Sequence, residues 1–236
     1  AYAFSEGRRM AADDVVRRLA ELAANYAAPP LHSAEEWVGS PDAEAESDTP
    51  SDPSGSTPLG SMKDPKPRLP LVEFTGGEPL LQPAVLPVMT RLCDTGFIVL
   101  VETSGALDIA PVDPRVRRIM DLKCPSSGEC GRNRIENLRL LRATDELKFV
   151  IGTLEDYEWA KEMIFRHQLA EVCPLLFSWV SPIGAAQRDP SLRPVPPGQT
   201  PLTRRQLAER IIADALPVRF QLQMHKFIWP ADERGV

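Results

Sequence analysis

The sequence predicts an α/β protein in which a parallel sheet alternates with crossover helices. Short apolar runs typical of strands alternate along the chain with longer segments of helical periodicity, which is the pattern of strand–helix–strand units. Polar residues follow several of the expected strands, at the ends where parallel α/β sheets bind ligands. We therefore expect a ligand site at the carboxyl edge of the sheet.

The expected elements follow from the local patterns along the chain. Residues 11–26 have helical periodicity, with Val15, Val16, Leu19 and Leu22 on one side. Strands are expected where short apolar runs stand between turn residues, at 71–75, 97–102, 116–122, 147–151, 175–180 and 218–222. Further helices are expected at 83–94, 133–141, 154–167 and 203–215, the last of them capped by Thr203.

Length and composition indicate a single domain spanning residues 1–236. A chain of 236 residues with 43% hydrophobic content can bury one substantial core. The net charge of −6 provides no broad basic surface for nucleic acid, and no apolar run of about 18 residues indicates a membrane span. Four cysteines indicate no disulfide framework and favour a cytoplasmic location.

Proline is concentrated in two interruptions of this pattern. Residues 39–70 combine many prolines with Ser, Asp and Glu and contain few large apolar residues. Such a segment cannot bury enough surface to offset its ordering entropy, so we expect a disordered insertion there, a partner-docking loop being the alternative. Residues 187–201 are also rich in proline and are expected to form an extended loop.

The segment 71–79, of sequence LVEFTGGEP, predicts a buried strand that runs into a turn at the start of a helix. Gly76 and Gly77 allow positive φ and a close backbone approach to a ligand. Free N–H groups at a helix start favour an anionic ligand group, and the Glu78 carboxylate can hold a ligand ammonium. Together these groups suit an amino-acid moiety, and an ordinary helix-capping turn is the alternative interpretation.

Several segments together resemble one enzyme family. LVEFTGGEP resembles the motif with which radical S-adenosylmethionine enzymes hold the methionine part of their cofactor. The segments ETSG at 102–105, DLKCP at 121–125, ELKFVI at 146–151 and QLQMHKFI at 221–228 follow it. Their order and spacing are similar to those of the 7-carboxy-7-deazaguanine synthases. The resemblance covers about residues 1–36 and 68–236.

The resemblance implies a partial (β/α) barrel of about six strands. It implies conversion of 6-carboxy-5,6,7,8-tetrahydropterin to 7-carboxy-7-deazaguanine with release of ammonia, started by a 5′-deoxyadenosyl radical, on the route to queuosine and related bases. The implied cofactors are a 4Fe-4S cluster, S-adenosyl-L-methionine and Mg²⁺. The implied partners are the pterin substrate, a second copy in a homodimer and an electron donor such as flavodoxin.

The family's cluster loop, commonly Cys-x3-Cys-x2-Cys, has no counterpart among the cysteines of this sequence. The first ten residues resemble the segment that follows this loop, so we expect the first strand, the cluster ligands and the Mg²⁺ ligand upstream of Ala1. Cys124 and Cys130 could bind a metal together, but two thiols complete no cluster site. No catalytic or metal-binding residue is therefore assigned, and the chain as it stands is expected to make no product.

The cofactor-binding residues are carried over from the family position by position. They are Gly76, Gly77, Glu78, Ser104, Asp121, Lys123 and Ser181. Ser104 is expected to reach a ribose hydroxyl, an ordinary Ser-Gly turn being the alternative. Asp121 and Lys123 are expected on the nucleoside side, and a simple strand-end ion pair is their alternative. Ser181 lies where many relatives have Gln-Pro, so only backbone contacts are carried over there.

Thr75, Gln223 and His225 are assigned to the substrate on the same basis. Thr75 is alternatively a routine strand former. Gln223 and His225 are two residues apart and therefore share one face of the last expected strand. In the family the histidine contacts the pterin, and simple packing is its alternative here. His32 and His167 match no motif and are expected at the surface.

Two other functions stay open. A different radical S-adenosylmethionine enzyme, such as an activase of glycyl-radical enzymes, would share Gly-Gly-Glu-Pro but is not expected to end in Gln-x-His-Lys. A non-catalytic remnant that binds S-adenosylmethionine or a partner is the third hypothesis. A cluster loop encoded in frame just upstream of the chain would favour the synthase over the remnant.

Overall fold

The computed structural model describes residues 8–24, 71–180, 195–224 and 228–229. Their strands form one sheet of six, in which each strand pairs in parallel with its neighbour in the sequence. The strands are β1 (Leu71–Phe74), β2 (Ile98–Thr103), β3 (Arg117–Asp121), β4 (Glu146–Ile151), β5 (Leu175–Trp179) and β6 (Arg219–Gln221). The described α-helices are α2 (Ala12–Ala24), α3 (Val85–Asp94), α4 (Leu154–Arg166) and α5 (Arg204–Ala213).

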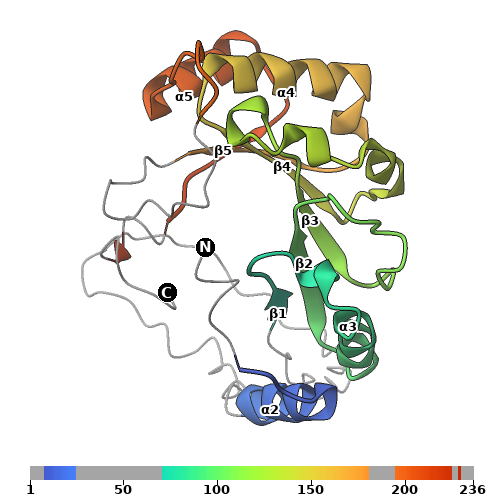
Figure 1. The fold of residues 1–236 in the computed structure, drawn as a ribbon. Coiled ribbons are helices and arrows are strands. Elements are labelled where there is room, and N and C mark those ends of the chain that lie inside the picture. The colour runs from blue at the N-terminus through green and yellow to red at the C-terminus, as the bar shows by residue number, and fades with distance from the viewer. Residues whose placement is uncertain (1–7, 25–70, 181–194, 225–227, 230–236) are drawn as a thin grey trace, which may run out of the picture.

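The sheet curves without closing. Figure 1 shows the strands along an arc, with α2 and α3 outside one end and α4 and α5 outside the other. β1 and β6 are the two ends of the strand order and do not pair with each other. The predicted α/β class and partial (β/α) barrel are therefore confirmed. Among the described helices none has the length and apolar character needed to cross a membrane.

Two hydrophobic clusters pack the helices onto the outer face of the sheet. At one end α3 contributes Met89 and Leu92, which are fully buried with Val99 and Val101 of β2. At the other end the core includes buried side chains of β4, α4 and β5, among them the rings of Phe149, Tyr157 and Phe177. Successive side chains of a strand point to opposite faces, so the residues between these core positions face the concave side.

A buried ion pair fixes the beginning of β3. Arg118 and Asp145 are each 1% exposed, and the guanidinium donates from Nε to Asp145 Oδ2 at 3.1 Å. Asp145, just before β4, also accepts the backbone N–H groups of Arg118 and Arg142, both at 2.9 Å. A second guanidinium nitrogen donates to the carbonyl of Leu140 at 2.6 Å. Both charges are therefore satisfied where two neighbouring strands begin.

Some expected elements differ in length, type or burial. The helix expected at 133–141 is a 3₁₀ helix, Ile135–Leu140, which is anchored from outside because Asn137 donates to the carbonyls of Gly105 and Leu107. The strand at 71–75, which was expected to be buried, is β1 at one end of the sheet, and its Leu71 is 53% exposed. The last strand ends at Gln221, earlier than expected. The predicted insertion at 39–70, Ser181 and His225 lie outside the described residues.

The Arg118–Asp145 pair predicts a large stability effect. Asp145→Ala should lower the free energy of unfolding by about 3–5 kcal/mol, because it leaves a buried guanidinium uncompensated. Urea unfolding monitored by circular dichroism measures this loss. Asp14→Ala is the control, since it removes an exposed ion pair with Arg17 and should change stability little. Equal effects of the two substitutions would contradict the importance of the buried pair.

Candidate ligand site at the carboxyl edge of the sheet

The Gly-Gly turn has the predicted backbone, and a short 3₁₀ turn separates it from the predicted helix. Gly76 and Gly77 have φ of 86° and 45°, in the left-handed region where glycine is favoured. The next element is a single 3₁₀ turn, Pro79–Leu81, and α3 begins only at Val85. Pro83 has no N–H to donate to the carbonyl four residues earlier, so an α-helix cannot start here. The helix expected at 83–94 is therefore present as α3, and the binding of an anionic ligand group at the turn stays a prediction.

Glu78 joins the end of β1 to the end of β2. Its carboxylate accepts Thr103 Oγ1 at 2.8 Å, Ser104 N at 2.8 Å and Ser104 Oγ at 2.5 Å. It also accepts Leu80 N at 3.1 Å, which confirms the capping interpretation. Both carboxylate oxygens are thus engaged within the protein. These contacts show that Glu78 shapes the turn, and its direct contact with a ligand ammonium stays a prediction.

Asp121 and Lys123 lie together where β3 ends. Lys123 Nζ is 2.7 Å from Asp121 Oδ2, so the ion pair considered as the alternative interpretation is present. Asp121 Oδ1, however, is buried and has no hydrogen-bond partner within the described residues. Buried polar atoms are almost always paired with protein, water or ligand. The pair therefore leaves one buried acceptor that suits the hydroxyl or N–H of a ligand.

A cavity of about 440 Å³ lies on the concave face of the sheet, which we call the lumen. Polar side chains from five strands and from the chain after β6 line it, namely Glu73, Glu102, Glu146, Lys148, Ser178, Gln221 and Gln223. Ile119, Val150 and Leu176 provide apolar wall. Gln223, predicted to bind substrate, is therefore on the cavity wall. Volumes of about 300–1,000 Å³ are typical of small-molecule sites.

Glu102 is the electrostatic centre of the lumen. Lys148 forms an ion pair with it across the sheet, and Thr75 Oγ1 donates to it at 3.0 Å. Burial raises the pKa of Glu102, but the hydrogen bond and charge of Lys148 outweigh this, with help from Thr75 and Lys123, and lower it below its usual range. Burial and the charge of Glu102 raise the pKa of Glu73, which Lys148 only partly opposes.

The lumen contains site residues that the sequence did not assign. Thr75 was expected to contact substrate, but it was not expected to donate to Glu102. Glu102 and Lys148 belong to segments that resemble family motifs, yet neither had a role, and Glu73 was treated only as part of a strand. Period-two alternation was the available signal, because it places Glu73 and Thr75 on the same face of one strand.

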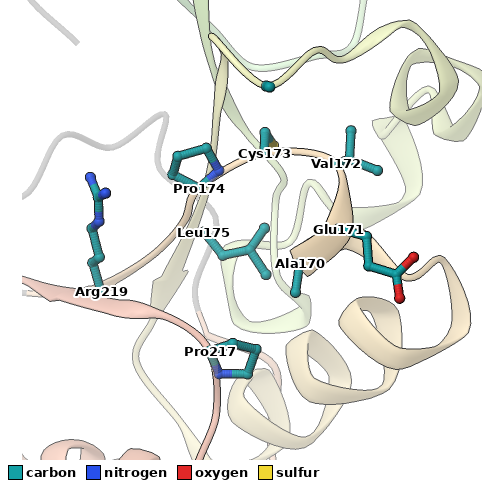
Figure 2. A pocket seen from close by; sticks show the side chains of 9 residues that line it. Ala170, Glu171, Val172, Cys173, Pro174, Leu175, Pro217 and Arg219 are labelled. Carbon is teal, nitrogen blue, oxygen red and sulfur yellow. The ribbon is translucent and has the colours of Figure 1, made fainter.

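A second hollow lies at the opposite edge of the sheet. Figure 2 shows its lining, which includes Cys173, Leu175 at the start of β5 and Arg219 at the start of β6. Its volume is about 410 Å³. Burial raises the pKa of the Cys173 thiol to about 11, so this sulfur is a poor nucleophile and metal ligand. This hollow contains none of the predicted site residues.

The described cysteines do not fit an iron–sulfur cluster. No group of three potential metal-binding side chains occurs among the residues that the structure describes. Burial raises the pKa of Cys124 well above its usual value and that of Cys130 to a lesser degree, which disfavours the thiolate form. Neither a 4Fe-4S cluster nor a fully protein-held Mg²⁺ is therefore supported by this part of the chain.

The open parallel sheet and its polar lumen define an α/β protein of the partial (β/α) barrel type, with a cavity of the size typical of small-molecule sites. No family model matches the chain. A 7-carboxy-7-deazaguanine synthase of Koribacter versatilis is 46% identical over 169 residues, 70% of this chain and 72% of the relative. Synthases of the same name from Chlorobaculum tepidum and Thermoplasma acidophilum are 41% and 32% identical, covering 71% and 75% of this chain and 69% and 75% of the relatives. The chain belongs to the 7-carboxy-7-deazaguanine synthase family.

The ion pair in the lumen predicts that the pKa values of Glu102 and Glu73 both depend on Lys148. Lys148→Met should raise the pKa of Glu102 and of Glu73, because both carboxyls lose the cation that lowers their pKa. Glu102 then becomes protonated at a higher pH, and its contribution to stability is lost earlier as the pH falls. Carbon-13 NMR titration of the glutamate carboxyls measures both values. Lys161→Met is the control on α4, and unchanged values in Lys148→Met would contradict the lumen arrangement.

Proposed function

We propose that this protein converts 6-carboxy-5,6,7,8-tetrahydropterin to 7-carboxy-7-deazaguanine with release of ammonia, on the route to queuosine and related 7-deazapurines. The observation that carries the proposal is the polar lumen cavity, whose Glu102 accepts a hydrogen bond from Thr75 next to the Gly-Gly turn, in a chain that belongs to this synthase family. The reaction releases ammonia and rearranges the ring, which makes it a carbon–nitrogen lyase reaction.

The lumen suits a pterin-like ring chemically. The amino group and ring N–H of an aminopyrimidinone are donors, and the lumen presents acceptors on Glu73, Glu102 and Glu146. Lys148 keeps Glu102 ionised and therefore able only to accept. Ile119 and Val150 offer apolar surface for the ring faces. We infer that the ring binds across the strands, with Thr75 and Gln223 near it.

S-adenosylmethionine suits the edge just above the lumen. Gly76 and Gly77 expose backbone in the left-handed conformation, and Asp121 Oδ1 offers a buried acceptor without a partner within the described residues. Ser104 donates its hydroxyl to Glu78 and accepts the Ala106 N–H at 3.4 Å, which leaves one oxygen lone pair for a ligand hydroxyl. When bound and reductively cleaved, this cofactor supplies an organic radical that starts the rearrangement. The chain's own residues orient the two ligands and shield them from water.

A non-catalytic S-adenosylmethionine-binding protein is the second candidate. The observation that favours it is the lack of a three-residue metal-binding group in the described part of the chain. Such a protein would bind the cofactor at the same edge without reducing it. The activity assay that follows separates the two functions.

The activity is tested in two forms of the protein, the chain as it stands and the chain preceded by the three-cysteine loop typical of the family. Both are reconstituted anaerobically with iron and sulfide and supplied with dithionite, S-adenosylmethionine and the pterin. We expect 7-carboxy-7-deazaguanine only from the second form, since no residue described here can hold the cluster. Product from the chain alone would contradict the cluster assignment. No product from either form would favour the non-catalytic candidate.

Glu78→Ala should weaken S-adenosylmethionine binding at least about tenfold, because charge-assisted hydrogen bonds are typically worth about 1.5–3 kcal/mol. The effect is expected to be indirect, since the lost bonds hold the ends of β1 and β2 together. Isothermal titration calorimetry measures binding, and amide exchange at Ser104 reports whether the turn has loosened. An unchanged dissociation constant with faster exchange would show that the turn shape does not matter for binding.

A further inference from the structure

The backbone of Lys123, just after β3, is held by two hydrogen bonds to the side chain of Asn133. We call this pair of bonds the clasp. Lys123 N donates to Asn133 Oδ1 at 2.9 Å, and Asn133 Nδ2 donates back to the Lys123 carbonyl at 2.8 Å. Asn133 follows a 3₁₀ turn, Cys130–Arg132, so the clasp closes a short loop on itself. A side-chain amide carries the donor and the acceptor side by side, so it fixes both sides of one residue's backbone.

The same segment is fastened to the end of β4 by Asp156. This residue is 0% exposed and accepts Ser126 N at 2.8 Å and Ser126 Oγ at 2.6 Å. It also accepts Gly152 N at 2.9 Å and Thr153 N at 3.1 Å. The capping box of α4 needs only the bond to Thr153. The bonds to Ser126 go beyond capping and connect the exits of two neighbouring strands.

The end of β5 is packed into the same arrangement. A Cβ added to Gly152 would lie 2.7 Å from Val180 Cγ1 and 3.6 Å from Ser126 Oγ. Asp156 therefore holds Gly152 where the exits of β3, β4 and β5 meet with no room for a side chain. A shift of the β3 exit would have to be accommodated by all three.

The clasped segment carries a charge that acts on the ligand edge. Lys123 Nζ lies 2.7 Å from Asp121 Oδ2, next to the buried Oδ1 that has no partner in the described residues. The Lys123 charge also contributes to lowering the pKa of Glu102 in the lumen. Its backbone position thus affects both the cofactor side and the substrate side of the proposed site.

We propose that Asn133 and Asp156 are positioning residues of the ligand edge, which hold the β3 exit so that the Lys123 ammonium stays on Asp121 and within electrostatic range of Glu102. Neither residue is expected to touch a ligand. The placement of Lys123 does not depend on the proposed function. The effect of the Lys123 position on S-adenosylmethionine binding, in which the nucleoside hydroxyls would contact Asp121, rests on the proposed function.

The test uses neutral substitutions in the full chain, Asn133→Ala and Ser126→Ala, so that no charge is removed directly. Both should raise the pKa of Glu102, measured by carbon-13 NMR, because Lys123 moves away. Both should weaken S-adenosylmethionine binding, measured by calorimetry, by about threefold to tenfold per lost hydrogen bond. Ser126→Ala leaves the α4 capping box intact, which guards against a variant that fails to fold.

Tyr157→Phe is the matched control, on helix α4 next to Asp156. It removes hydroxyl bonds to Asp214 at 2.7 Å and to the Arg210 carbonyl at 3.0 Å, away from the β3 exit. It should lower the melting temperature without changing the Glu102 pKa or the dissociation constant.

The outcomes separate the positioning role from the proposed function. A raised Glu102 pKa in Asn133→Ala and Ser126→Ala, with weaker binding, supports the proposal. The same raised pKa with no S-adenosylmethionine binding to any form, wild type included, supports the positioning role and counts against the proposed function. An unchanged Glu102 pKa in both variants, with a lower melting temperature like that of the control, overturns the proposal.

Discussion

Carboxylates that accept hydrogen bonds from the exit of a neighbouring strand hold the carboxyl edge of the sheet together. Adjacent strands of a parallel sheet end side by side but are joined in sequence only through a crossover connection. Their exits therefore need fastening by side chains. Glu78 connects the exits of β1 and β2, and Asp156 connects those of β3 and β4. The turn, the Asp121–Lys123 pair and the mouth of the lumen all depend on these contacts for their positions.

The sequence predicted the features that depend on local pattern. Strand–helix alternation predicted the parallel sheet, and two adjacent glycines predicted the left-handed turn. The helix expected at 133–141 failed because Asn137 bonds to backbone about thirty residues earlier, a contact that periodicity does not encode. The direction of the Glu78 side chain also depends on strand register, which sets Thr103 and Ser104 beside it. The Gly-Gly-Glu-Pro motif alone is equally compatible with a Glu78 that contacts a ligand and with a Glu78 that stabilises the turn.

One lysine organises the protonation of the lumen. Lys148 lowers the pKa of Glu102 while burial and Glu102 raise that of Glu73, so two carboxyls in one cavity respond oppositely to their surroundings. Such divergence is typical of functional sites. It arises from side chains on three strands that face the lumen together. Propensity and motif matching treat those residues separately, and only the folded sheet shows that they share one cation.

The strand order has a consequence for how the chain folds and tolerates change. Because each described strand pairs with its predecessor in the sequence, the sheet can grow by adding one strand–helix unit at a time, and none of the described pairings skips a strand. Each pairing nonetheless closes a long crossover connection, and parallel sheets are intrinsically slow to form for this reason. The stretch between α2 and β1 interrupts no described strand pair. Its length can therefore change over evolution without altering the register on which the lumen is built.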